Sequence, residues 1–203
     1  HLLCMTFLGS KKFITKSYFT NHYIPNFLIT IMEAIKQIQS LLQEAEQIAK
    51  DELGLDNIFY NERFVEMFMA NHLGHEYGNN TQGGDALDAT ETPTEYKAIN
   101  LRSKSKGTFQ FHWLSKNKIK KYAQTNNMYF AIRDGVTIEK IYEVPTDVIM
   151  PVLEAKATNS KSINGHAGFN EKKLIEEFNA KLVYDAEKFN CAYSGLTSPA
   201  AYE

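Results

Sequence analysis

The chain has 203 residues, of which 43% are hydrophobic and 23% charged, a composition typical of one soluble globular domain with a substantial core. Two cysteines are too few for a disulfide-stapled fold and favour a reducing compartment, and no apolar run is long enough to predict a membrane-spanning helix. The net charge of −2 argues against a nucleic-acid partner, but nine Lys or Arg and no Asp or Glu occur from Lys97 to Arg133. This basic stretch is a candidate phosphate-binding surface.

Residues 1–31 are rich in aromatic side chains and lack the features of a secretory signal, so we treat them as an extension of unknown role. We expect one domain over residues 32–203. Apolar residues recur every three to four positions from Met32 to Leu53, which predicts a helix that Gly54 ends, with an apolar stripe for a core or subunit contact. A second helix is expected to begin at Asn61, whose side chain is a candidate cap.

The most informative stretch has two arms, residues 83–88 and 94–100, joined by a turn at Pro93. Alternation along the second arm puts Glu95 and Lys97 on one face of a strand, and a hairpin would bring Asp85 or Asp88 back beside that face. Two clustered carboxylates repel each other, and a hard cation such as Mg²⁺ relieves the repulsion, while a nearby ammonium can orient a water. This pattern is typical of metal-dependent phosphodiester cleavage, although surface hairpins also carry it by chance.

The rest of the sequence predicts further strands and helices. Strands are expected at residues 108–113, 128–133, 136–142 and 182–184, with a hairpin turn at Asp134-Gly135. Helices are expected at residues 116–124, 145–156 and from Glu171, with residues 159–168 as a polar loop. Helices flanking a mixed central sheet of about five or six strands give an α/β (α+β) fold.

Several motifs in order resemble one known family. They are GLDNIF at residues 54–59, EYKAIN at 95–100, KGTFQFHW at 106–113 and NGHAGFN at 164–170, within a similarity over roughly residues 32–183. They resemble the PvuII family of type II restriction endonucleases, in the PD-(D/E)xK nuclease superfamily. The resemblance implies a Mg²⁺-dependent homodimer that cuts specific double-stranded DNA sites to 5′-phosphate and 3′-hydroxyl ends. It also implies a prokaryotic cytoplasm and a cognate DNA methyltransferase in the same system.

The resemblance also assigns regions and residues. Residues 32–76 would serve dimerisation and DNA contact, 83–144 the catalytic sheet, and 159–185 recognition. Asp85 and Glu95 would hold the metal, and Lys97 and Tyr122 would act beside the scissile phosphate. By the resemblance, Asn61, His112 and Asn170 are DNA-binding candidates, of which His112 and Asn170 would read bases. The basic stretch adds candidates for phosphate contact, namely Lys104, Lys106, Lys116, Lys118 and Lys120.

Ordinary roles compete with these assignments. Tyr122 is also a candidate for core packing, Asn170 for capping the helix at Glu171, and His112 for a structural position among aromatic residues. The alternative functions are another nuclease on the same fold, such as a repair nickase or junction resolvase, and a catalytically inactive DNA-binding module.

Overall fold

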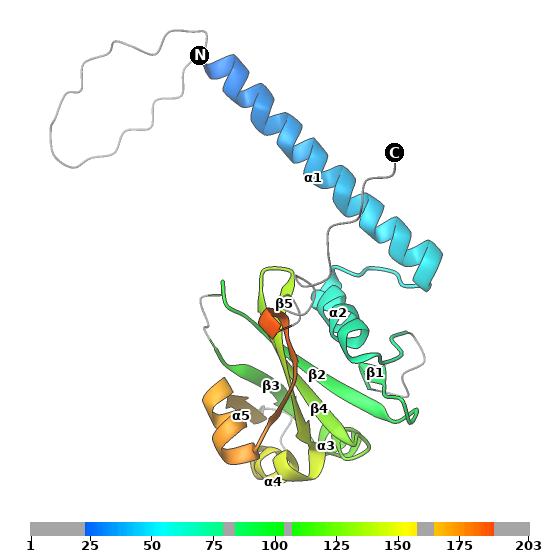
Figure 1. Cartoon of the computed structure of the whole chain (residues 1–203), viewed down its shortest axis with the longest axis vertical. Helices are drawn as coiled ribbons and strands as arrows, with labels where there is room; N and C mark the ends of the chain where they lie inside the picture. The colour runs from blue at the N-terminus through cyan, green and yellow to red at the C-terminus, as the bar shows by residue number, and fades with distance from the viewer. Residues whose placement is uncertain (1–22, 79–83, 104–106, 158–164, 189–203) are drawn as a thin grey trace, which may run out of the picture. The chain divides into compact units, whose positions relative to one another are not determined.

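The computed structural model describes residues 23–78, 84–103, 107–157 and 165–188, coloured in Figure 1. The chain divides into two compact units, His1–Gln47 and Ile48–Glu203. Helix α1 (Tyr23–Leu53) begins in the first unit and ends in the second. It starts before the predicted Met32, with Pro25 in its first turn, where a proline needs no N–H. It ends as predicted before Gly54, whose φ of +64° suits glycine.

The second unit holds a mixed five-stranded sheet in the order β1-β2-β4-β5-β7 and a separate two-stranded sheet, β3-β6. Within the larger sheet β2 and β4 are parallel and the other pairs antiparallel. This confirms the predicted α+β fold with a mixed central sheet. The strands are β1 (Ala86–Leu87), β2 (Pro93–Asn100), β3 (Phe109–Leu114), β4 (Asn127–Asp134), β5 (Thr137–Pro145), β6 (Gly165–Phe169) and β7 (Lys181–Asp185). The remaining helices are α2 (Arg63–Leu73), α3 (Lys116–Tyr122), α4 (Thr146–Lys156) and α5 (Glu171–Phe178).

Two hydrophobic cores lie on opposite faces of the five-stranded sheet. Helix α2 covers one face, where its Val65 and Met69 pack with Tyr96 of β2. The other face is covered by the β3–β6 sheet and by α3, α4 and α5 (Figure 1), and Ile99 of β2 belongs to that core. Successive residues of β2 therefore face different cores, as the predicted alternation required.

Short-range sequence patterns predicted several element boundaries correctly. Gly135, with φ +63°, forms the tight turn between β4 and β5. Ser115 caps α3, its Oγ accepting from the Lys118 N–H at 3.2 Å. Asn170 caps α5, its Oδ1 accepting from the Lys173 N–H at 2.8 Å. These signals are short-range, so the sequence alone carries them.

The prediction that Asn61 caps α2 was wrong. Asn61 lies in a short 3₁₀ turn, η1 (Tyr60–Glu62), with φ +50°, and α2 begins only at Arg63. Glu62 is also left-handed, with φ +60°. The buried Arg133 donates to the Glu62 carboxylate at 2.7 Å, so β4 holds this turn in place. A side-chain contact from a distant strand thus overrides the local capping preference.

The prediction of a polar loop over residues 159–168 was wrong in its last part, where β6 begins at Gly165; residues 158–164 lie outside the described residues. Glycine and histidine have low strand propensity, and backbone pairing with β3 stabilises β6 in place of that propensity. Gly165 is required there, because a Cβ would lie 2.2 Å from the Lys156 carbonyl oxygen. Ala167 and Phe169 face the core, which leaves His166 exposed beside β3.

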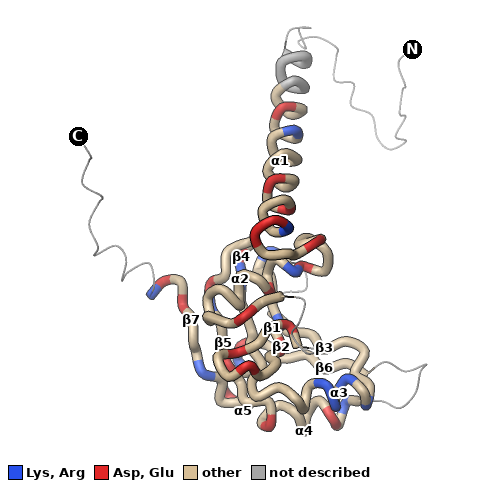
Figure 2. Tube along the Cα trace, turned by 90° about the vertical axis from the view of Figure 1, so that its right-hand side faces the viewer, with Lys and Arg blue, Asp and Glu red and all other residues tan. Residues whose placement is uncertain are grey.

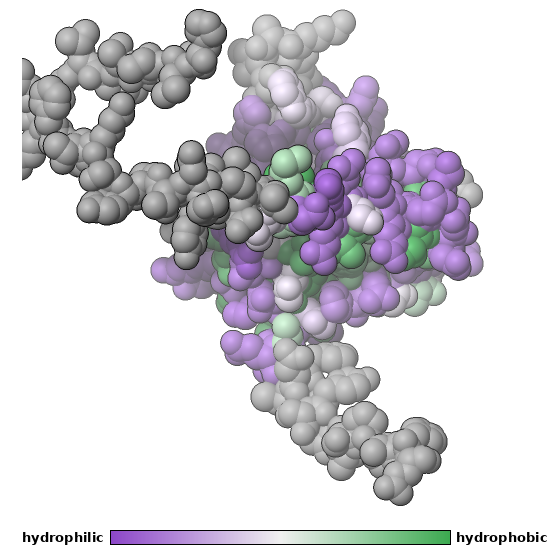
Figure 3. All heavy atoms as spheres, turned by 90° about the horizontal axis from the view of Figure 1, so that it is seen from above, coloured by the Kyte–Doolittle hydropathy of each residue, from purple (hydrophilic) through white to green (hydrophobic). Residues whose placement is uncertain are grey.

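Hydrophilic residues dominate the face of the molecule drawn in Figure 3, and apolar residues show only in small areas between them. Among the described residues, no helix combines the length and the apolar character needed to cross a bilayer.

Candidate active site

The β1–β2 hairpin positions the two aspartates differently. The Asp85 N–H donates to the Thr94 carbonyl at 2.8 Å, so Asp85 lies directly beside β2. Asp88 organises the turn instead, because its Oδ1 accepts from the backbone N–H groups of Thr90 at 2.8 Å and Thr92 at 3.0 Å. Asx turns of this kind are a common structural role for aspartate.

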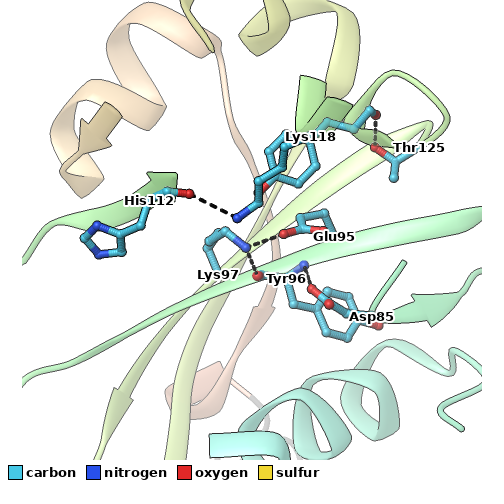
Figure 4. Close-up of polar contacts among 8 residues, drawn as sticks. Asp85, Glu95, Tyr96, Lys97, His112, Lys118 and Thr125 are labelled. Atoms are coloured by element: carbon cyan, nitrogen blue, oxygen red, sulfur yellow. Dashed lines mark hydrogen bonds and ion pairs between the residues drawn. The ribbon is translucent and has the colours of Figure 1, made fainter. Parts of the chain in front are cut away.

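Asp85, Glu95 and Lys97 meet at one point of β2, as Figure 4 shows. The Asp85 Oδ2 accepts from the Tyr96 N–H at 2.7 Å. The Lys97 ammonium pairs with the Glu95 carboxylate and donates to the Tyr96 carbonyl at 2.8 Å. The Glu95 and Lys97 side chains are only 7% and 19% exposed. The structure therefore places Asp85, rather than Asp88, beside Glu95 and Lys97.

The charges of this cluster are strongly coupled. Burial raises the pKa of Asp85 to about 6, and the negative charge of Glu95 adds to the rise. Burial alone would lower the pKa of Lys97, but Glu95 and Asp85 outweigh it and raise that pKa. Lys97 is therefore an ammonium at neutral pH, suited to stabilising negative charge.

Glu66 on α2 is a neighbour of this cluster that the sequence did not identify. Burial and the charge of Asp85 raise its pKa to about 7, and the Tyr77 hydroxyl donates to its Oε2 at 3.2 Å. No local pattern marks Glu66, because its proximity to Asp85 depends on how α2 packs against the sheet.

The donor set fits a hard divalent cation. Asp85 and Glu95 supply carboxylate oxygens, and Mg²⁺ commonly takes one or two carboxylates together with waters and substrate phosphate. The described residues contain no cluster of three or more His, Cys, Asp or Glu able to hold a metal by themselves. The pKa of Asp85 is raised first by burial and then by repulsion from Glu95, and a bound proton or a bound cation would offset both effects.

This coupling predicts a pH-dependent response to cations. Raised pKa values mean that folded Asp85 and Glu66 keep protons that the unfolded chain releases, so their contribution to stability falls as pH rises from about 4 to about 7. Mg²⁺ should therefore raise the melting temperature more at pH 7.5 than at pH 5, where protons compete for the carboxylates. Thermal unfolding with and without Mg²⁺ at both pH values measures this. Equal shifts at the two pH values, or a shift that persists in Asp85→Asn, would contradict it.

Tyr122 is a core residue that lies near the catalytic cluster. Its ring is fully buried against Phe111, with centroids 5.8 Å apart, and the Lys97 Nζ lies 6.0 Å from its centroid. Its buried hydroxyl has no hydrogen-bond partner among the described residues. Burial and the negative charges of Glu95 and Asp85 raise its pKa. The Tyr122 hydroxyl is thus a buried donor near the carboxylates of Glu95 and Asp85.

The predicted basic stretch is not one continuous surface. Arg133 is 4% exposed and binds Glu62, Lys97 is mostly buried, and Arg102 pairs with Asp134. The basic surface that the structure does describe is that of α3, where blue segments gather in Figure 2. It carries Lys116, Lys118, Lys120 and Lys121, whereas Lys104 and Lys106 lie outside the described residues.

A polar groove of about 400 Å³ runs along β2 from Lys97 to Asn100. Glu62 and Arg133 line one part of it, and Gln110 of β3 lines another. Asn61, next to Glu62 in the chain, is exposed, and His112 is exposed on β3. Asn170 differs from these candidates because its Oδ1 is already used to cap α5.

A mixed sheet that brings the carboxylates of Asp85 and Glu95 and the ammonium of Lys97 together at β2, beside a polar groove, is consistent with the fold of a restriction endonuclease. The model of the family described as restriction endonuclease PvuII matches residues 30–182. The chain therefore belongs to the PvuII restriction endonuclease family, and this membership supports a nuclease that acts on DNA. A search of curated proteins found no match.

Proposed function

We propose that the protein is a Mg²⁺-dependent type II restriction endonuclease that cuts both strands of specific DNA sites, leaving 5′-phosphate and 3′-hydroxyl ends. The convergence of Asp85, Glu95 and Lys97 in the fold of this family carries the proposal. A dedicated DNA methyltransferase would protect the host genome at the same sites.

In this mechanism Asp85 and Glu95 would hold the cation, which when bound would neutralise phosphate charge and make an attacking water more acidic. Lys97 is kept cationic by its two carboxylate neighbours and is held by the Tyr96 carbonyl. It would stabilise the negative charge that develops on the phosphate. The Tyr122 hydroxyl, for which the described part of the chain shows no hydrogen-bond partner, would donate a hydrogen bond to a phosphate oxygen.

Digestion of a fully sequenced plasmid tests this function. Incubation with Mg²⁺ should give discrete fragments, and sequencing of their ends should reveal one palindromic site with 5′-phosphate termini. Excess EDTA should prevent cutting. Products that carry only single-strand nicks would instead support a nickase, and complete absence of cutting would support an inactive DNA-binding module.

A palindromic site calls for a two-fold symmetric dimer, and α1 offers an apolar stripe for one. Met32, Ile35, Ile38 and Leu41 are each 57–58% exposed in the single chain. We expect sedimentation equilibrium to give a dimer for the wild type and a monomer for Ile38→Glu, because a buried charge would destabilise the interface. Ser40→Glu, on the opposite side of the helix, should remain dimeric. A dimeric Ile38→Glu would place the interface elsewhere.

The lysines of α3 are expected to bind DNA phosphates without reading sequence. Lys116→Gln and Lys120→Gln should each weaken binding to all sequences alike and reduce the slope of log affinity against log salt by about one. Lys172→Gln, an exposed lysine of α5 outside this surface, is the matched control and should leave the slope unchanged. A variant that alters sequence preference at an unchanged salt slope would contradict a pure phosphate contact.

A further inference from the structure

The exposed face of the β3–β6 sheet carries a histidine pair that the proposed mechanism does not use. His112 of β3 and His166 of β6 are both exposed, and their Nδ1 atoms are 3.2 Å apart. Their rings meet edge to face, with centroids separated by 5.3 Å. Trp113, 64% exposed, lies with its ring centroid 6.3 Å from that of His166. Two hydrogen-bonding rings and one large aromatic ring thus share one open surface.

A β-bulge creates this arrangement. Phe111 pairs with Ala167 and Leu114 pairs with Gly165, so two residues of β3 face the single His166 between them. Trp113 has φ +58°, a conformation that bulky side chains rarely adopt. The flanking pairs hold this strained residue in place, and strain of this kind is found most often at functional sites. The bulge turns both His112 and Trp113 outward.

The contact between the two rings constrains their hydrogen-bonding pattern. A bond between two Nδ1 atoms needs one N–H and one bare nitrogen, so two neutral rings must take opposite tautomers. One Nε2 is then a donor and the other an acceptor. Bases in the major groove are distinguished by their own patterns of donors and acceptors, and the linked pair presents one donor and one acceptor together, whereas a single neutral imidazole presents only one of them at its Nε2.

Strand β3, which carries His112, is also linked through Lys118 to the neighbourhood of the catalytic cluster. The Lys118 ammonium donates to the His112 carbonyl at 3.1 Å, as Figure 4 shows, and its position 5.8 Å from the Tyr122 ring centroid places it near that cluster. The exposed rings of His112 and His166 are not needed for the core, which is formed by the opposite face of β3 and β6.

We propose that His112 and His166 act as one unit that reads a single base pair in the major groove. The Nδ1 contact links the tautomer of His112 to that of His166, which presents a second ring nitrogen to the same base pair. This inference rests on the proposed function as a DNA endonuclease, and it assigns specificity to a residue that the sequence motifs did not single out.

The test measures cleavage rates on duplexes that carry every single base-pair substitution of the mapped site. His112→Ala and His166→Ala should each lose between about fivefold and 150-fold of discrimination, the effect of one base contact, at the same base pair. The double variant should lose no more than either single variant, because the two residues form one unit. His166→Asn, which keeps a polar group near the position of Nδ1, should retain more discrimination than His166→Ala.

Two controls accompany these variants. His72→Ala removes an exposed histidine of α2 whose ring lies tilted beside that of Tyr184, with centroids 4.1 Å apart, and it should keep wild-type discrimination at every position. Thermal unfolding should show that each variant is folded. The proposal is overturned if His166→Ala discriminates as well as wild type, or relaxes a base pair different from the one relaxed by His112→Ala. Failure of the wild type to cut any DNA would overturn the proposed function itself, before any variant is compared.

Discussion

Asp85→Asn is expected to reduce DNA cleavage by at least about 10²- to 10³-fold, the scale seen when one charge-stabilising group is removed from an active site. The change removes one of the two carboxylates that would hold Mg²⁺, while the amide oxygen can still accept from the Tyr96 N–H. Cognate DNA binding should be largely retained. Single-turnover cleavage and gel-shift binding, measured on the same mapped site, separate the two effects.

Asp88→Asn is the matched control, with the same change on the same hairpin. Its amide oxygen can still accept from the Thr90 and Thr92 N–H groups, so the turn is preserved and cleavage should fall by less than about tenfold. An inactive Asp88→Asn beside an active Asp85→Asn would show that the wrong carboxylate has been assigned.

The same Asp85→Asn variant should be more stable than wild type in the absence of cations. At pH 7.5 the wild-type carboxylate is ionised in a partly buried position beside Glu95, and its raised pKa means that this ionisation opposes folding. A neutral amide removes that opposition. Higher melting temperature together with lost activity is the combination expected of a residue placed for function at a cost in stability.

Lys97→Met should be as damaging as Asp85→Asn. Methionine fills the space beside Phe111, whose ring centroid lies 5.3 Å from the Lys97 Nζ, but it removes the ammonium that pairs directly with Glu95. Cleavage should fall by about 10²- to 10³-fold in single-turnover assays, while the cognate site is still bound.

Lys97→Arg should fail to restore cleavage, because a planar guanidinium does not fit the place of a compact ammonium between Glu95 and the Tyr96 carbonyl. Lys172→Met changes a lysine whose side chain is 75% exposed on α5 and should cut at the wild-type rate. Retention of more than about a tenth of wild-type activity in Lys97→Met would remove this lysine from the mechanism.

The sequence predicted well those features that depend on neighbouring residues. The alternation of Glu95, Tyr96 and Lys97, the cap at Ser115 and the turn at Gly135 all follow from short-range periodicity or backbone preference. The choice between Asp85 and Asp88 needed the register of the hairpin, which places Ala86 opposite Thr94. A shift of this register by one residue would have placed the side chains of the shifted strand on the opposite face of the sheet.

Features that depend on distant contacts could not be predicted. Strand β6 is rich in glycine and is stabilised by pairing with β3, and Asn61 loses its capping role because Arg133 holds the neighbouring Glu62. The charge of Arg133 suggested a surface position, yet the folded chain buries it. The pairing of His112 with His166 likewise joins residues that only the fold brings together.

The central claim is that Asp85 and Glu95 hold a divalent cation needed for DNA cleavage. The most direct test compares cutting of the mapped site by the wild-type enzyme in Mg²⁺, in Ca²⁺ and in excess EDTA, with the product ends determined. We predict double-strand cleavage with 5′-phosphate ends in Mg²⁺, specific binding with little or no cutting in Ca²⁺, whose coordination is larger and looser, and no cutting in EDTA. Robust cleavage in excess EDTA would contradict the claim.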